Sequence, residues 1–164
     1  MPATFEPIAS TTLSAATSTV EFTSISSSYT DLVLIFNGGE NGTNKDFQLR
    51  VGNGSIDTGS NYSWTRMLGD GSVASSSRGS NTTYIENVIG NESCTAIYHF
   101  MNYSNTTTNK TILSRTAYAS SRTSAYVGLW RSTSAITHIR FTAETGSTIN
   151  SGSTFSLYGI RAGA

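Results

Sequence analysis

Short segments in which apolar and polar residues alternate recur along the whole chain, and this period of two constrains the fold more than any other feature. In one such segment Phe47, Leu49 and Val51 alternate with Gln48 and Arg50. Alternation of this kind indicates a strand with one buried and one exposed face. The apolar spacing of an amphipathic helix, at i, i+3, i+4 and i+7, is not present in any long window. The chain is therefore expected to fold without helices.

Clusters of Gly, Asn, Asp and Ser separate these segments, as NGGENGTN does at 37–44. Regularly spaced strands with turn chemistry between them predict an all-β fold: an antiparallel, jelly-roll-like β-sandwich of about 8–10 strands. The expected strands are 17–25, 31–36, 47–51, 61–68, 83–89, 94–103, 111–119, 124–131, 135–142 and 154–160. The serine-rich segment 73–80 is interpreted as a polar loop. Residues 17–164 are expected to form a single domain, preceded by an N-terminal arm or first edge strand at 1–16.

The composition excludes several classes of partner. Charged residues make up 12% of the 164 residues, and the formal net charge is zero. Nucleic acids and anionic membranes are bound through a basic excess, so neither is an expected partner. The chain contains 27 Ser and 25 Thr. Threonine suits a half-exposed strand face, and periodic aromatic residues supply a core, so we expect an ordered domain.

The sequence DTGS at 57–60 matches the loop that carries the catalytic carboxylate of aspartic proteases. Those enzymes need two such aspartates facing each other. Here Gly54 and Ser55 precede Ile56 at positions where the protease loop has apolar residues, and no convincing second motif follows. We interpret 57–60 as a turn in which Asp57 accepts backbone N–H groups and Gly59 adopts a positive φ. No catalytic residue is assigned, and the chain is not expected to be an enzyme.

Metal and cofactor motifs are equally weak. Cys94, His99 and His138 lack the spacing of a zinc site, and we interpret them as structural residues. The loop 37–46, with Glu40 and Asp46, offers oxygen ligands for a weakly bound calcium ion, but a solvated turn explains it better. No metal and no cofactor are therefore predicted.

Aromatic residues are the remaining candidates for binding. Tyr62 and Trp64 alternate with polar residues in one expected strand, and Tyr126 and Trp130 lie in another. Exposed rings of this kind form platforms for glycans or contacts between subunits, whereas buried rings form a core. Both interpretations remain open from the sequence, and packing is favoured.

Three stretches, taken together, resemble a known module. They are VEFTSISSSYTDLVLIF at 20–36, GSNYSWTRMLGDGSVASSSRGS at 59–80 and GLWRSTSAITHIRFTAETGSTINSGSTFSLYGI at 128–160. They resemble a β-sandwich found in bacteriophage virion proteins, both in small capsid decoration (cement) proteins and at the C-termini of tail fibres. The segments Phe5–Ile8 and Phe155–Ile160 fit the same pattern.

This resemblance implies a non-enzymatic structural protein on the virion surface, assembled in the host cytoplasm, commonly as a homotrimer. The absence of a cationic and apolar leader at the N-terminus agrees with this. We expect a decoration protein that binds the major capsid protein or other virion proteins and stabilises the particle. Phe5, Pro7 and Ile8 are the expected capsid contacts of an N-terminal arm. The alternative is a tail-fibre protein that recognises host-surface glycans.

Overall fold

A computed structural model describes residues 5–42, 46–88, 94–118 and 121–161 of the chain. Every regular element in these ranges is a β-strand, and all strand pairs are antiparallel. The predicted all-β antiparallel sandwich is confirmed, while the jelly-roll connectivity stays a prediction. Fourteen strands are present in the described residues, more than the 8–10 expected.

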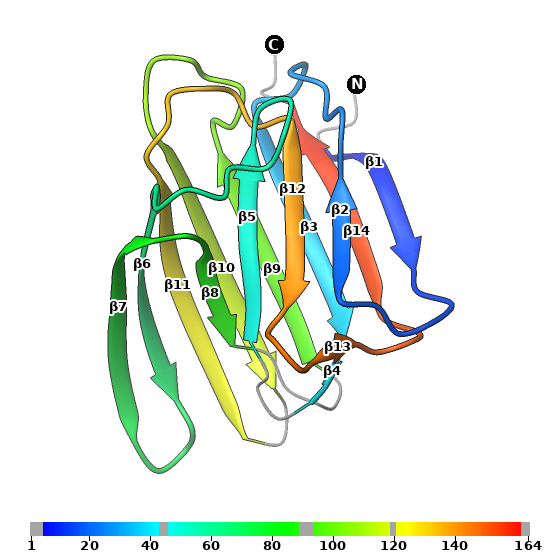
Figure 1. Cartoon of the computed structure of the whole chain (residues 1–164), viewed down its shortest axis with the longest axis vertical. Coiled ribbons are helices and arrows are strands. Elements are labelled where there is room, and N and C mark those ends of the chain that lie inside the picture. The colour runs from blue at the N-terminus through cyan, green and yellow to red at the C-terminus, as the bar shows by residue number, and fades with distance from the viewer. Residues whose placement is uncertain (1–4, 43–45, 89–93, 119–120, 162–164) are drawn as a thin grey trace.

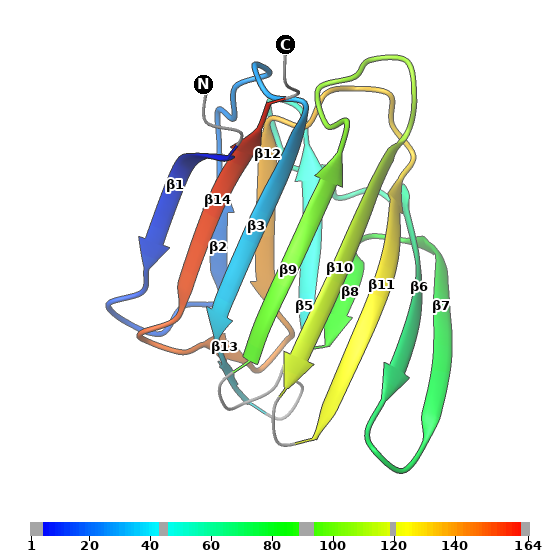
Figure 2. The ribbon, with the colours of Figure 1, turned by 180° about the vertical axis from the view of Figure 1, so that it is seen from behind.

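An eight-stranded sheet forms one layer of the molecule (Figure 2). Its strands, in spatial order, are β1 (Phe5–Thr12), β14 (Thr154–Ile160), β3 (Asp31–Gly38), β9 (Cys94–Met101), β10 (Lys110–Tyr118), β11 (Arg122–Trp130), β6 (Tyr62–Gly69) and β7 (Ala74–Thr82). Because β1 and β7 are the first and last strands of this order, they form the two edges of the sheet.

A four-stranded sheet covers the middle of one face of the larger sheet (Figure 1). Its strands, in spatial order, are β2 (Thr19–Phe22), β12 (His138–Ala143), β5 (Asp46–Gly52) and β8 (Ile85–Val88). Two short strands, β4 (Glu40–Asn41) and β13 (Thr148–Ile149), pair with each other. We call the face of the eight-stranded sheet toward the four-stranded sheet the inner face, and the opposite one the outer face.

The core lies between the two sheets. Alternation along β9 places Ala96, Tyr98 and Phe100 on the inner face, each 0% exposed. Phe141 of β12 meets Tyr98 with ring centroids 4.9 Å apart, so the core is closed by rings from both sheets. Burial of each such side chain contributes roughly 1.5–3 kcal/mol to folding, which explains why the alternating pattern specifies the sandwich.

Close approach of the sheets requires glycine at one central position. A Cβ on Gly128 of β11 would lie 2.5 Å from Cδ1 of Ile85 in β8. The absent side chain therefore lets β8 lie directly against β11.

One expectation about local structure needs correction, and of the two forms expected for the N-terminal segment the described residues show the edge strand. The segment interpreted as a polar loop at 73–80 forms most of strand β7, because pairing with β6 supplies backbone hydrogen bonds that serine propensity does not predict. The N-terminal segment is not a free arm over its described residues. Phe5–Thr12 form edge strand β1, which pairs with β14 along its length. Residues 1–4 lie outside the described residues.

Candidate interaction surfaces

The outer face of the eight-stranded sheet has no second layer over it in the described part of the chain (Figure 2). Large hydrophobic side chains are nevertheless exposed there: Phe5, Met67, Met101, Leu113 and Val127. Another exposed residue of this kind, Val73, lies in the turn between β6 and β7, and its side chain is 62% exposed. Exposed apolar groups that are contiguous, rather than scattered, mark an interaction site.

Strand register makes four of these positions neighbours. Leu113 of β10 lies directly opposite Val127 of β11, and Ala125 of β11 lies opposite Met67 of β6. Met101 is paired with Thr111, two residues before Leu113. We call the set Met67, Met101, Leu113, Ala125 and Val127 the apolar patch.

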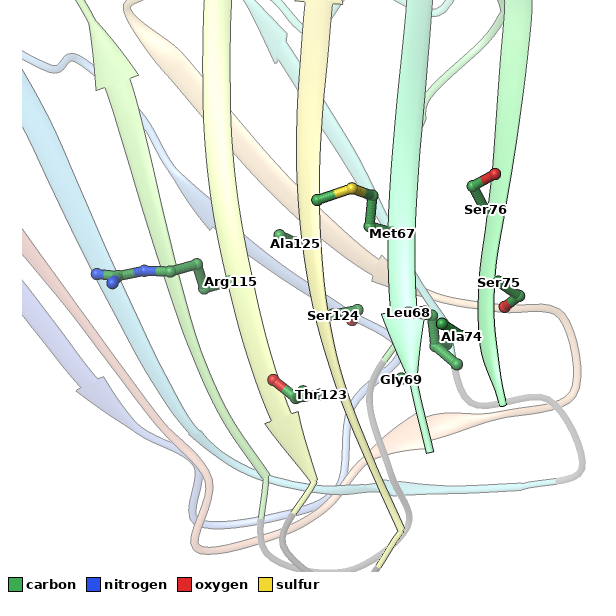
Figure 3. Close-up of a pocket in the computed structure, with 10 residues that line it drawn as sticks. All are labelled: Met67, Leu68, Gly69, Ala74, Ser75, Ser76, Arg115, Thr123, Ser124 and Ala125. Atoms are coloured by element: carbon green, nitrogen blue, oxygen red, sulfur yellow. The ribbon is translucent and has the colours of Figure 1, made fainter. Parts of the chain in front are cut away.

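Two hollows adjoin within the apolar patch. The first, of about 580 Å³, is lined by residues that include Met67, Gly69, Ala74, Arg115 and Ala125 (Figure 3). Figure 3 shows the Met67 side chain extending toward β11, while Arg115 extends from β10 over β9. The second hollow, of about 390 Å³, shares Arg115 and Ala125 with the first. The small side chains of Ala74 and Ala125, and the absent one of Gly69, produce the depression.

Arg115 is the central charge of the apolar patch. Its side chain is exposed, and no hydrogen bond or ion pair joins it to any described residue. Three other arginines have carboxylate partners: Arg66 pairs with Glu86, Arg140 with Glu21 and Arg161 with Glu6. The Arg115 guanidinium is thus available to a carboxylate from outside the chain.

The β1 edge is a second exposed apolar region of the outer face. Phe5 is 52% exposed and Pro7 is exposed, and the Phe5 ring lies 6.0 Å from that of Tyr158 in β14. Ile8 is half-buried and packs against the core, next to a register shift between Pro7 and Ala9. The predicted contact residues therefore divide: Phe5 and Pro7 are accessible, whereas Ile8 anchors the strand.

The turn between β6 and β7 carries an exposed carboxylate beside an exposed apolar side chain. Oδ1 of Asp70 accepts hydrogen bonds from the backbone N–H of Val73, at 2.7 Å, and of Ser72, at 2.9 Å. These hydrogen bonds lower the pKa of Asp70, so the carboxylate is ionised at neutral pH. The backbone N–H of Asp70 also donates to the carbonyl of Val73 at 3.2 Å, which holds the two residues side by side.

The aromatic residues proposed as a glycan or subunit platform are mostly buried. Tyr62 is 0% exposed, Trp130 3% and Tyr126 4%, and only Trp64 is partly exposed. The expectation of a surface platform is therefore corrected for Tyr62, Tyr126 and Trp130, because rings enclosed between β-sheets cannot stack on a sugar. Packing, the favoured interpretation, is what the structure shows for these three.

Asp57 has a structural role in the segment before β6. Its carboxylate accepts hydrogen bonds from Gly59 N at 2.8 Å, from Asn61 Nδ2 at 2.9 Å and from Trp130 Nε1 at 2.7 Å. Partial burial raises the pKa of Asp57, but these hydrogen bonds outweigh it and hold the pKa below its usual range. The predicted turn is confirmed, except that Gly59 does not have a positive φ.

The carboxylates near the β4–β13 end form a buried acidic region. Glu40 is 0% exposed, its Oε1 accepts the backbone N–H of Glu144 at 3.1 Å, and its Oε2 has no hydrogen-bond partner. Burial, together with the charges of Asp46 and Glu144, raises the pKa of Glu40 to about 8, despite the hydrogen bond from Glu144. Glu40 is therefore protonated at neutral pH.

This acidic region is not arranged as a metal site. In the ranges that the structure describes, no three His, Cys, Asp or Glu side chains are grouped so that they could share an ion. His99 lies on the outer face opposite Leu113, His138 lies in β12, and Cys94 is buried at the start of β9. The three side chains therefore lie apart.

Sequence reasoning did not find the apolar patch. A signal was present, because Leu113 and Val127 are apolar residues on the strand faces opposite the buried Ile112 and Tyr126. Apolar residues on both faces of a strand predict cover on both sides. Which strands lack that cover became apparent only from the sheet order.

No known protein-family profile matches the chain, and no curated protein sequence matches it significantly. Among the described residues there is no helix of the length and apolarity needed to cross a membrane.

Proposed function

We propose that this protein is a non-enzymatic structural protein of a bacteriophage virion, where it decorates the capsid and stabilises the particle. The observation that carries the proposal is the uncovered outer face, on which apolar side chains and hydroxyl groups predominate over charges. Such a face favours contact with another protein surface. The resemblance to virion modules, which rests on the three sequence stretches alone, supplies the context.

The β1 edge is the proposed contact with the major capsid protein. Phe5 and Pro7 are exposed on the outer face, so a capsid protein can contact them without disturbing the core. Burial of the exposed part of an aromatic ring stabilises a complex by up to roughly 1.5–3 kcal/mol per side chain. In a homotrimer the contacts of linked copies act together on the particle, so a modest contact at each site gives high occupancy.

The sharpest test substitutes exposed side chains instead of deleting residues 1–16. Because Ile8 packs against the core and β1 pairs with β14, deletion would uncover the sheet edge and confuse misfolding with lost docking. We expect Phe5→Ser to reduce occupancy on capsids of the major capsid protein encoded in the same genome at least about fivefold. Occupancy is measured by quantitative mass spectrometry of purified particles.

Thr12→Ala is the matched control, since Thr12 is an exposed residue on the same strand. It should bind like the wild type. Equal occupancy of Phe5→Ser and wild type, or no association with particles at all, would overturn the proposal. Loss of glycan binding in Trp64→Ala, measured on a glycan array, would favour the receptor-binding alternative instead.

A further inference from the structure

The β6–β7 hairpin projects beyond the end of the four-stranded sheet (Figure 1). Its tip holds Asp70 and Val73 next to each other, and the Val73 side chain is 62% exposed. An exposed valine beside an ionised carboxylate needs a site that offers both an apolar surface and a cation. The first hollow of the apolar patch is such a site.

The hollow matches the tip in chemistry and in spacing. Ala125 forms its floor, and Arg115 lies directly opposite Ala125 on the neighbouring strand. Paired residues of adjacent strands are about 5 Å apart, as are two residues that face each other across a tight turn. A valine placed over Ala125 thus brings the adjoining carboxylate beside the backbone of Arg115, and the exposed Arg115 side chain, which extends over β9 (Figure 3), has to turn back toward β11 to meet it.

We propose that the tip of the β6–β7 hairpin of one copy docks in the first hollow of a second copy. Val73 contacts Met67 and Ala125, and the Asp70 carboxylate pairs with the guanidinium of Arg115. Where the contact is not reciprocated between the same two copies, successive copies close into a ring or continue as a filament. The contact gives a physical basis for the homotrimer that we expect from the proposed function. Only the number of copies rests on that proposed function.

Charge argues against the simplest competitor, in which two outer faces pack on each other around a two-fold axis. That arrangement brings the Arg115 of one copy toward the Arg115 of the other across an apolar surface, and Arg78 lies on the same face. Like charges in a desolvated contact are unfavourable. Docking of the tip instead neutralises Arg115.

Gly69 offers a test that leaves the fold intact. A Cβ at this position meets no other atom within 4 Å, and Gly69 does not adopt a positive φ. Gly69→Leu therefore fills the hollow from inside the same chain without a clash. We expect sedimentation velocity of the purified protein to show an oligomer for the wild type, and an increase of at least about a hundredfold in its dissociation constant for Gly69→Leu.

The charge pair is tested by substitution and exchange. Arg115→Gln and Asp70→Asn should each weaken self-association about tenfold. Asp70→Asn retains the Oδ1 acceptor that the turn requires. The double variant, in which Asp70→Arg and Arg115→Asp exchange the two charges, should self-associate more tightly than either charge-reversal variant alone. Arg78→Gln, on the same face but outside the hollow, is the matched control and should associate like the wild type.

These measurements of self-association need no capsid. A failure of the tip contact can therefore be distinguished from a failure of capsid docking through β1. A monomeric wild type at about 100 µM, or an oligomer insensitive to Gly69→Leu and Arg115→Gln, overturns the tip contact and leaves capsid docking through β1 intact. Loss of capsid occupancy in Phe5→Ser with unchanged self-association supports both proposals together.

Discussion

Strands β10 and β11 present two faces of opposite character, although both are built by the same alternation. On the inner face Ile112 and Tyr126 are enclosed by the second sheet, whereas on the outer face their chain neighbours Leu113 and Val127 are each 44% exposed. Apolar chemistry alone therefore does not decide what an apolar residue does in this protein. An apolar side chain with a second layer above it stabilises the fold, and one without such a layer is available to a partner.

The inner face should be by far the more sensitive to truncation. Phe141 is fully buried, with ring contacts to Phe47, Tyr98 and Phe155. We expect Phe141→Ala to lower the free energy of unfolding by about 3–5 kcal/mol, because it leaves a cavity that the sheets cannot close. Urea denaturation followed by tryptophan fluorescence measures this change. A loss below about 1 kcal/mol would show that the two faces do not differ as described.

The free energy of unfolding should depend on pH through the buried carboxyl group of Glu40. The pKa of Glu40 is about 8 in the folded protein and near 4.5 when unfolded, so between these values the folded state holds a proton that the unfolded state releases. The contribution of Glu40 to stability is therefore largest below about pH 4.5 and falls as the pH rises toward 8, with a slope of up to about 1.4 kcal/mol per pH unit. Glu40→Gln should flatten this slope in urea titrations between about pH 5 and 8. A slope unchanged by Glu40→Gln would refute the assignment.

Glycines on the two faces should respond differently to the same side chain. We expect Gly128→Val to destabilise the protein by about 1–3 kcal/mol, because its Cβ collides with Ile85 beneath β8. Gly69→Val is the matched control in the same sheet, and it should change the free energy of unfolding by less than about 0.5 kcal/mol, since its Cβ enters open space. Thermal denaturation of dilute, dissociated samples compares the two variants.

The smallest effect on folding is expected on the outer face. Leu113→Ser should change the free energy of unfolding by less than about 0.5 kcal/mol, because the side chain is already partly in water. It should also self-associate like the wild type, because Leu113 lines the second hollow and not the first, which the β6–β7 tip enters. A strongly destabilised Leu113→Ser protein would mean that the outer face contributes to the fold itself.

The prediction of strands succeeded where the pattern was strongly apolar and failed where it was not. The last strand was predicted with its full bounds, because Phe155 and Leu157 alternate without interruption and glycine and serine precede them. Strand β7 was missed, since its nine residues include four serines and no large apolar side chain. Pairing with β6 imposes the strand conformation of β7, and a local sequence pattern does not predict such pairing.

The sequence by itself determined the fold class and the turn at Asp57, because periodicity and turn chemistry are local. Only the tertiary structure decided which face is covered. The fourteen strands of the described residues divide into sheets of eight, four and two, so the largest sheet has area that the four-stranded sheet cannot enclose. Leu113 and Ile112 are adjacent in the sequence and similar in chemistry, and the sheet order alone makes one a core residue and the other part of a surface.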